Sequence, residues 1–357
     1  MKARYWHTLD DGRVQCDLCP RFCRLRDGQA GFCFVRANRG DELDLTTYGR
    51  SSGFCVDPIE KKPLNHVAAG QPILSFGTAG CDLACRFCQN WDMSTARQFD
   101  VLSVEAPPDA IVATALANQC CGVAYTYNDP VIYPEYAIDV AQATHAAGLL
   151  NVAVTAGSIN PEPRADFFAS MDAANVDLKS MNPDFYRRIV GGRLEVVQDT
   201  LRYLAHETNV WVEVTTLVIP GYNDSDAEMS QLASWIAAEM GTSVPLHLTA
   251  FHPSYRMLDA PATPPSTLRR ARTIALNAGL KFVYTGNIVD NDGSTTRCHS
   301  CGTVIIGRRG YDVTTYRLTA DGRCAHCGAV IPGRWGRTVG NFSNRRRPVN
   351  LVRHQSH

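Results

Sequence analysis

Between residues 73 and 286, short and nearly continuous apolar runs alternate with longer stretches that have the apolar period of a helix. Such runs are typical of parallel strands covered on both faces, and repeated βα units predict a parallel sheet or barrel. The expected strands cover 73–78, 122–126, 150–155, 174–178, 210–218, 245–250 and 281–285, and the expected helices 108–119, 131–147, 195–205, 226–238 and 265–278. These units number about six to seven, fewer than the eight of a closed TIM barrel. We therefore expect an α/β fold with a partial (β/α)6 TIM-like barrel.

Both flanks lack this pattern and are rich in cysteine. Residues 1–55 hold many cysteine, arginine and glycine residues but too few apolar residues for a core of their own, so a metal would stabilise them. Residues 297–337 hold two CxxCG sequences, and a polar, arginine-rich stretch follows. The expected parts are a Cys-rich metal-binding region (1–56), the partial barrel (57–290), a zinc-ribbon-like module (291–340) and a disordered basic tail (341–357).

Charge and hydropathy exclude some classes of partner. The 357 residues include 35 Lys and Arg against 35 Asp and Glu, so net charge gives no reason to expect nucleic acid or an anionic membrane. The short basic cluster at residues 345–347 is interpreted as a solvated end. No apolar stretch approaches the ~20 residues of a membrane helix. The N-terminus lacks the apolar core of a signal peptide, so we expect a cytoplasmic protein.

Fourteen cysteines are the most informative feature of the composition. In a reducing compartment, clustered thiols indicate metal ligands rather than disulfides. Eleven of them form three groups: Cys16, Cys19, Cys23 and Cys33; Cys81, Cys85 and Cys88; and Cys298, Cys301, Cys324 and Cys327. Cys120 and Cys121 are expected to pack as small hydrophobic residues. Cys55 could be an additional ligand, an active-site thiol or inert.

The central group, Cys81-x3-Cys85-x2-Cys88, directly follows the first expected strand, where α/β folds place functional loops. A cubane iron–sulfur cluster normally takes four thiolates, so three leave one iron without a protein ligand. A catalytic metal needs such an open position to bind its substrate. The sequence therefore predicts a catalytic [4Fe–4S] cluster here. A structural zinc or iron–sulfur site with a fourth ligand elsewhere is the alternative.

The CxxxCxxC sequence with Phe87 before its last cysteine resembles the signature of the radical S-adenosylmethionine (SAM) superfamily. In that superfamily the amino and carboxylate groups of SAM chelate the open iron, and reductive cleavage gives a 5′-deoxyadenosyl radical that abstracts hydrogen. Other segments recur in family order: DPIEKKP (57–63), YTYNDP (125–130), DLK (177–179), IPGYND (219–224), HP (252–253) and YTGN (284–287). Together they resemble the AmmeMemoRadiSam-system radical SAM enzymes, in the pyruvate formate-lyase activating enzyme-like branch.

This resemblance implies SAM contacts at the strand ends. Residues 127–129 stand where many relatives carry Gly-Gly-Glu to hold the SAM ammonium, which a carboxylate can bind through charge-assisted hydrogen bonds. Asp129 is one methylene shorter than that Glu, and it could instead cap the helix that begins near Pro130. The implied SAM-binding residues are Tyr127, Asn128, Asp129, Thr155, Asp177, Lys179 and His252, with Asn151 as a further candidate. The alternatives are a buried Asp177–Lys179 ion pair and a structural His252.

The flanking cysteines suggest further metals. The C-terminal CxxC-x22-CxxC predicts a zinc ribbon in which Cys298, Cys301, Cys324 and Cys327 saturate Zn²⁺. A rubredoxin-like iron is the alternative. The N-terminal group, Cys16, Cys19, Cys23 and Cys33, could hold zinc or an auxiliary [4Fe–4S] cluster. Pro20 after Cys19 is similar to ferredoxin usage, but the cysteine spacing does not match the ferredoxin run.

The leading hypothesis is a radical SAM enzyme, an activating-enzyme-like oxidoreductase that abstracts hydrogen from a protein or a small molecule. Flavodoxin or ferredoxin would be its reductant. Activation of a glycyl radical enzyme and modification of a Memo- or Amme-family partner are the versions that the resemblance implies. An RNA-modifying enzyme and a non-catalytic iron–sulfur or zinc scaffold are the alternatives, and the balanced charge argues against RNA.

Overall fold

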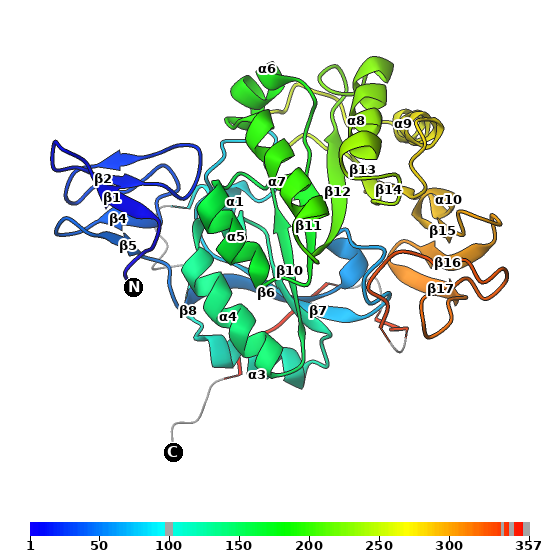
Figure 1. Cartoon of the computed structure of the whole chain (residues 1–357), viewed down its shortest axis with the longest axis horizontal. Coiled ribbons are helices and arrows are strands. Elements are labelled where there is room, and N and C mark those ends of the chain that lie inside the picture. The colour runs from blue at the N-terminus through cyan, green and yellow to red at the C-terminus, as the bar shows by residue number, and fades with distance from the viewer. Residues whose placement is uncertain (97–102, 337–338, 343–345, 353–357) are drawn as a thin grey trace.

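The computed structural model describes residues 1–96, 103–336, 339–342 and 346–352, and its centre is a parallel β-sheet (Figure 1). Seven parallel strands follow one another in chain order: β7 (Pro72–Gly77), β9 (Gly122–Tyr125), β10 (Leu150–Thr155), β11 (Ala173–Asp177), β12 (Trp211–Val218), β13 (Leu246–Ala250) and β14 (Val283–Gly286). Each lies within two residues of its expected bounds. Their residues are almost all buried, as the apolar runs predicted.

The sheet is mixed, because an antiparallel edge extends it beyond β7. Strand β6 (Arg50–Pro58) pairs antiparallel with β7, and both β8 (Val104–Glu105) and β18 (Arg347–Pro348) pair antiparallel with β6. Strand β6 crosses the expected boundary between residues 56 and 57. Its first half is polar and only partly buried, so it gives no apolar run to recognise.

Strand β18 also corrects the expectation of a disordered tail over 341–357. Within this tail, Val349 and Leu351 pack against the main core, and the Val352 amide donates a hydrogen bond to Thr114 Oγ1 at 2.9 Å. Pairing and apolar contacts therefore hold residues 346–352 on the sheet. Arg345 and residues 353–357 lie outside the described part.

The major helices cover the outer face of the sheet, as Figure 1 shows for α4, α5 and α7 in front of the strands. They are α3 (Pro108–Ala117), α4 (Pro134–Ala146), α5 (Pro161–Ala169), α7 (Leu194–His206), α8 (Asp226–Glu239) and α9 (Pro265–Asn277). Proline occupies the first position of α3, α4, α5 and α9, where its missing N–H costs nothing. Pro134 also disfavours a helical backbone at Tyr133 before it, so the helix expected from residue 131 starts only at Pro134, after the short turn η2 (Pro130–Ile132). Helix α5 was not expected.

Shorter helical turns connect these elements. They are η1 (Ile59–Lys61), α1 (Trp91–Ser94), α6 (Pro183–Phe185), the π-helical turn η3 (Tyr186–Val190) and α10 (Asn291–Ser294). No helix in the described ranges is long and apolar enough to cross a membrane.

The N-terminal region lies at one end of the long axis of the molecule (Figure 1). It contains an antiparallel sheet of β1 (Trp6–Thr8), β2 (Val14–Cys16) and β3 (Arg24–Leu25), and a hairpin of β4 (Arg36–Asn38) and β5 (Leu43–Leu45). Its apolar residues, such as Leu18 and Leu43, belong to the same core as the helices of the main sheet. A fully buried ion pair, Arg36 Nη1 to Glu135 Oε2 at 2.9 Å, joins β4 to α4.

We predict that Glu135→Gln lowers the free energy of unfolding by about 3–5 kcal/mol, because it leaves the buried Arg36 guanidinium without its counter-charge. Asp184→Asn removes the exposed partner of Arg187 and serves as the matched control. Its effect should be small, since exposed pairs contribute little. Urea unfolding of both variants checks this, and equal effects would contradict the role of the buried pair.

The C-terminal region occupies the opposite end of the long axis (Figure 1). Its antiparallel sheet consists of β15 (Thr296–Arg297), β16 (Val304–Arg309) and β17 (Asp312–Tyr316). Ile305 and Ile306 of β16 share a small core with Phe282 and Tyr284, which lie at β14. This module is therefore packed against the last parallel strand rather than held only by its linker.

A buried histidine connects this module to the main sheet. His66 Nδ1 donates to the Pro332 carbonyl and Nε2 accepts from the Tyr284 hydroxyl, each at 2.6 Å. These partners suit the neutral imidazole, and burial lowers the pKa of His66 from 6.5 to about 4.

Stability should therefore fall as the pH drops from about 6.5 to about 4, by up to roughly 3 kcal/mol from His66. In this window the unfolded chain binds a proton that the folded protein excludes; above it, both states are neutral and the term vanishes. Urea unfolding at several pH values should show a shallower acid decline for His66→Gln than for the wild type. Parallel curves would contradict this assignment.

Candidate active site

A cavity of about 440 Å³ runs along the inner side of the parallel sheet. Residues at the carboxyl ends of β7, β9, β10, β11 and β14 line one end, where ligand sites of α/β folds lie. Residues 60–65 and the β16–β17 turn line the other end. The C-terminal module thus contributes Arg308 and Tyr311 to the same cavity as the central cysteines.

Cys81, Cys85 and Cys88, on the loop after β7, all line this cavity. They also line a second cavity of about 290 Å³ on the side of the N-terminal region. Burial raises the pKa of the Cys85 thiol to about 12, and the nearby Lys179 acts in the opposite direction. A bound metal cation would stabilise the thiolates that burial disfavours. No other cysteine in the described ranges lines either cavity.

Asn128 holds the backbone that leads into this loop. Its Oδ1 accepts from the Thr78 amide at 2.9 Å, and its Nδ2 donates to the carbonyls of Ala79 and Gly80 at 3.2 and 3.0 Å. A Cβ at Gly77 would lie 2.5 Å from the Thr126 carbonyl oxygen, so only glycine allows this close approach. Asn128 therefore positions the cysteine loop, although it also lines the cavity.

We predict that Asn128→Ala lowers retention of iron after reconstitution by about 10-fold or more, as is typical when a partner that orients metal ligands is lost. Iron per chain after a chelator challenge measures this effect. Asn277→Ala, at the exposed end of α9, is the control and should keep its iron. Full retention in Asn128→Ala would show that the loop holds its shape alone.

Asp129 caps the turn after β9, as one of the two sequence interpretations expected. Its Oδ1 accepts from Thr155 Oγ1 at 2.6 Å and from the Val131 amide at 3.3 Å, and its Oδ2 accepts from the Ala156 amide at 2.9 Å. It also lines the cavity, and burial raises its pKa. Burial and Asp129 together raise the pKa of the neighbouring Asp82 to about 7. Of these two buried carboxyl groups, Asp129 lines the cavity and Asp82 does not.

Asp177 and Lys179 form the ion pair that the sequence offered as an alternative, with Lys179 Nζ 2.6 Å from Asp177 Oδ2. Both line the cavity, as does Thr155. Burial disfavours the charge on Lys179, but Asp177 and Cys85 outweigh this cost and raise its pKa. A permanent cation therefore stands beside the cysteine loop. The ion pair does not exclude ligand contacts, since both side chains reach the cavity.

Two candidates lie elsewhere. The His252 side chain is exposed and does not belong to the cavity lining. Asn151 is buried away from the cavity and hydrogen-bonds Tyr125 and Ala141. The remaining candidate, Tyr127, lines the cavity and donates to Asp57 Oδ2 at 3.4 Å.

Sequence reasoning missed several lining residues. Thr215 in β12 has a buried Oγ1 without a hydrogen-bond partner in the described part of the chain, so it suits a polar ligand. At the far end, Arg308 pairs with Glu60, with both side chains 1% exposed. The inward alternation of β12 could have indicated Thr215, but no local pattern predicts a contact between residues 60 and 308.

Cys55 stands apart from the three cysteine groups. It is buried in β6, and its Sγ accepts from Arg346 Nε at 2.9 Å. It does not line the cavity. Cys120 and Cys121 are likewise packed against apolar residues.

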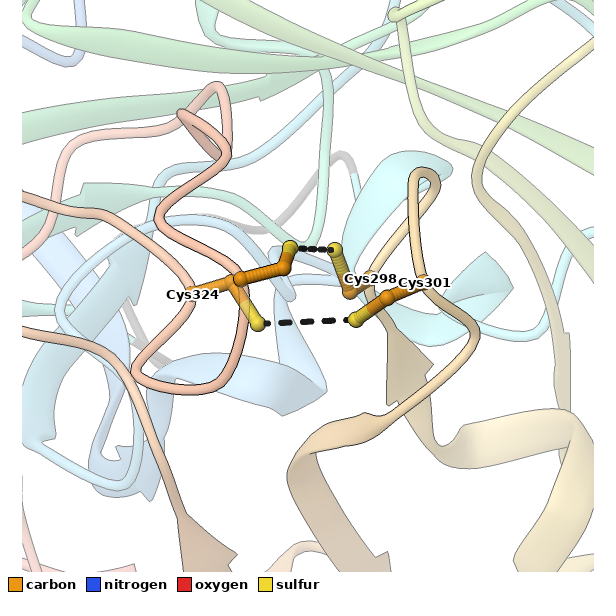
Figure 2. Close-up of side chains that lie close together, drawn as sticks. Cys298, Cys301 and Cys324 are labelled. Carbon is orange, nitrogen blue, oxygen red and sulfur yellow. Dashed lines mark hydrogen bonds between the residues drawn. The ribbon is translucent and has the colours of Figure 1, made fainter.

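The C-terminal cysteines converge on one point (Figure 2). Cys298 Sγ lies 3.6 Å from Cys327 Sγ, and Cys301 Sγ lies 3.9 Å from Cys324 Sγ. Four thiolates at about 2.3 Å from a tetrahedral Zn²⁺ are about 3.8 Å apart, so these distances fit a single metal ion. In the described part of the chain, this is the one group of three or more Cys, His, Asp or Glu whose ligand atoms lie within 4.8 Å of one another.

The N-terminal cysteines Cys16, Cys19, Cys23 and Cys33 line one small cavity of about 10 Å³. Arg21, Arg36 and Asp82 complete its polar lining. The four cysteines therefore border one cavity, although they come from a segment without helix or strand periodicity.

Comparison with known proteins identifies the central region. The sequence model of the Radical SAM superfamily matches residues 76–233. The chain is 38% identical to the uncharacterized protein MJ0808 of Methanocaldococcus jannaschii over 86% of this chain and 91% of that protein. It is 24% identical to the 4-hydroxyphenylacetate decarboxylase activating enzyme of Clostridioides difficile, over 37% of this chain and 41% of that enzyme.

A solved domain of a pyruvate-formate lyase-activating enzyme from Bacteroides vulgatus is 18% identical, with a TM-score of 0.42 over 46% of this chain and 99% of that domain. The activating-enzyme similarities are thus distant and partial, whereas the similarity to MJ0808 spans nearly the whole of both chains. The chain therefore contains a radical SAM domain, belongs to the same family as MJ0808 and is distantly similar to glycyl-radical activating enzymes.

Proposed function

We propose that this protein, as a member of the AmmeMemoRadiSam-system branch, uses a [4Fe–4S] cluster on Cys81, Cys85 and Cys88 to cleave SAM. One observation carries the proposal: the three thiols of one loop line the same cavity as the polar residues at the neighbouring strand ends. Three thiolates leave one iron free of protein ligands. When bound, the cluster supplies one electron to the SAM sulfonium, which releases methionine and a 5′-deoxyadenosyl radical.

The residues around the loop fit SAM by charge and position. The Asp129 carboxylate would attract the SAM ammonium by its negative charge. Lys179, which is paired with Asp177, would attract the SAM carboxylate by its positive charge. Since both Asp129 oxygens already accept hydrogen bonds, its part is to fix Thr155 and Ala156. Tyr127 and Asn128 shape the same wall, and His252 would reach SAM only if its loop moved.

The substrate would bind toward the far end of the cavity, between the strand ends and the β16–β17 turn. Arg308 and Glu60 are paired there, and Lys62 is paired with Asp57 at 2.7 Å, so the end offers polar groups without a large net charge. We infer a peptide segment of a partner protein, a glycyl radical enzyme or a Memo- or Amme-family protein, or a small molecule of similar polarity. The distant activating-enzyme similarity favours the protein substrate.

The flanking parts support this catalytic domain. We propose that the parallel sheet forms a partial (β/α)6 barrel and that the C-terminal cysteines hold a structural Zn²⁺ in a zinc-ribbon-like module. Flavodoxin or ferredoxin would supply electrons in the cytoplasm. An RNA-modifying role and a non-catalytic scaffold gain no support, since no specific observation favours either.

The test is anaerobic reconstitution of the full chain with iron and sulfide, followed by incubation with SAM and dithionite. Equal amounts of methionine and 5′-deoxyadenosine are expected, and a loaded cluster without product would overturn the proposal. Deuterated Memo- or Amme-family protein, added as substrate, should yield 5′-deoxyadenosine heavier by one deuterium. Unlabelled product would turn the search toward small molecules.

A further inference from the structure

We propose that Lys62 binds a small α-oxo acid covalently, as a Schiff base at the end of the cavity that residues 60–65 and the β16–β17 turn line. The covalent binding stands on its own, whereas the role of this compound as the substrate rests on the function proposed above. It selects the small-molecule version of that substrate, in place of the protein that the distant similarity favours.

Lysine is rare in this chain and is concentrated at the cavity. Among the 35 basic residues, five are lysines: Lys2, Lys61, Lys62, Lys179 and Lys281. Lys61, Lys62 and Lys179 line the cavity, whereas Lys2 and Lys281 are exposed on the surface. A primary amine can lose its proton and attack a carbonyl carbon, but an arginine guanidinium keeps its proton. Most of the side-chain amines of the chain therefore face one cavity.

Of the three cavity lysines, Lys62 is the one whose positive charge is disfavoured. It is 3% exposed. Burial lowers the pKa of its ammonium against the opposing effect of Asp57, and the neighbouring Lys61 charge adds to the lowering. The Lys61 side chain is 34% exposed, so water solvates its charge, and Asp177 holds Lys179 in its charged form. Burial and a second cation nearby are two ways in which proteins activate a lysine as a nucleophile.

Asp57 is the group that can take the proton from Lys62. It is buried, and its Oδ2 accepts from Lys62 Nζ at 2.7 Å and from the Tyr127 hydroxyl at 3.4 Å. Its Oδ1 accepts from Lys61 Nζ at 3.2 Å. Burial disfavours the charge on Asp57, but the two lysines outweigh this effect and lower its pKa. Asp57 is thus an ionised acceptor within the hydrogen-bond reach that a general base needs.

The covalent step balances without a co-reactant. The Lys62 ammonium gives one proton to Asp57, and the neutral amine attacks the carbonyl carbon. A proton then moves from nitrogen to oxygen, which gives a carbinolamine. Asp57 returns its proton to the carbinolamine hydroxyl, which leaves as water, and a carbon–nitrogen double bond replaces the carbon–oxygen double bond. The iminium carries the same single positive charge as the ammonium, so its ion pair with Asp57 persists.

The local charge favours a carbonyl compound that is also an acid. Lys61 and Lys62 share the single carboxylate of Asp57, while Arg308 has its own partner in Glu60. The Schiff base leaves this balance unchanged, so one positive charge at the cavity wall is without a carboxylate of its own. Because Lys61 lines the cavity, it would bind the carboxylate of an α-oxo acid through a charge-assisted hydrogen bond.

Tyr127 connects this site to the strand ends. Lys62 Nζ lies 5.3 Å from the centre of the Tyr127 ring, and both residues line the cavity. The next residue, Asn128, donates to the backbone that leads into the cysteine loop. A compound bound to Lys62 would therefore occupy the same cavity as the three thiols of that loop.

The test is reductive trapping in the full chain, without SAM or dithionite. Pyruvate with sodium cyanoborohydride converts a Schiff base into a stable amine, and mass spectrometry of peptides locates this adduct. Most of the adduct should be on Lys62 in the folded wild type, and this preference should disappear in urea. An even distribution over the five lysines, or a folded chain without adduct on Lys62, would overturn the proposal.

Three variants sharpen the test. Lys62→Arg keeps a positive charge beside Asp57 and should lose the adduct, whereas Lys281→Arg, at an exposed position, should keep it. If Lys62→Arg does not fold, the mapping in the wild type decides alone. Lys61→Gln should weaken trapping of pyruvate more than trapping of acetone, which has no carboxylate. Equal weakening would overturn the acidic class of the ligand but not the Schiff base.

Failure of the proposed function shows differently, because trapping needs neither the cluster nor SAM. A chain that is trapped at Lys62 but makes no 5′-deoxyadenosine after reconstitution would overturn the proposed function alone. A chain that makes 5′-deoxyadenosine but is not trapped at Lys62 would overturn this inference alone.

Discussion

Cys85→Ala should reduce 5′-deoxyadenosine formation by at least about 100-fold, since loss of groups that merely orient ligands already costs 10–100-fold in other metal sites. Cys85 is the middle ligand of the loop and the one beside Lys179. In the described ranges, the cavity offers no fourth cysteine to replace it. Two thiolates cannot hold a cubane in place with one iron directed at the strand ends. The reaction with dithionite and SAM, followed by chromatography, measures the loss.

Cys120→Ala is the matched control, because Cys120 is also buried but packs in the core away from the cavity. Its turnover should stay within about 2-fold of the wild type, with only a small loss of stability. Turnover by Cys85→Ala at the wild-type rate would mean that the cluster lies elsewhere. Equal loss in both variants would mean that the assay reports folding.

The second large effect is expected from Cys324→Ser in the C-terminal group. Cys324 is 1% exposed, and its thiol faces Cys301 across the converging loops. Structural zinc sites contribute about 10–16 kcal/mol to folding in isolated zinc-finger peptides. Loss of one thiolate should therefore remove the metal and unfold the module, while the parallel sheet keeps its own core. Zinc content and thermal unfolding followed at two wavelengths measure both effects.

This unfolding should also affect the far end of the cavity, because Arg308 and Tyr311 belong to the same module. Glu60 would then lose its buried partner Arg308. A chelator should reproduce the stability change in the wild type, whereas Cys121→Ser should not. A variant that keeps its zinc, or loses it without any change in unfolding, would contradict a structural role.

Local patterns predicted the parallel sheet because buried parallel strands are apolar along their whole length. Strands β7 and β10 are recognisable for this reason alone. Strand β6 is half polar, and β18 is only two residues long, so their pairing depends on partners far away in the chain. The tail illustrates the same limit: its composition is that of a mobile end, yet Val349 and Leu351 find apolar contacts on the sheet.

The candidate site divides in the same way. The cysteine loop and Asp129 could be located because each directly follows a recognisable strand. Arg308 and Glu60 are 248 positions apart in the chain and come into contact only because the C-terminal module packs against the main sheet. No periodic pattern in the sequence predicts this contact. His252 was chosen by resemblance, and the loop after β13 directs its side chain to the exterior instead.

Electron paramagnetic resonance of the reduced protein with and without SAM tests most directly whether one iron of the central cluster is open. The signal to follow is the one that disappears when Cys81, Cys85 and Cys88 are all replaced by alanine. The g-values of this signal should change when SAM is added, because SAM becomes a ligand of the open iron. A signal from these three cysteines that stays the same at saturating SAM would contradict the proposed function.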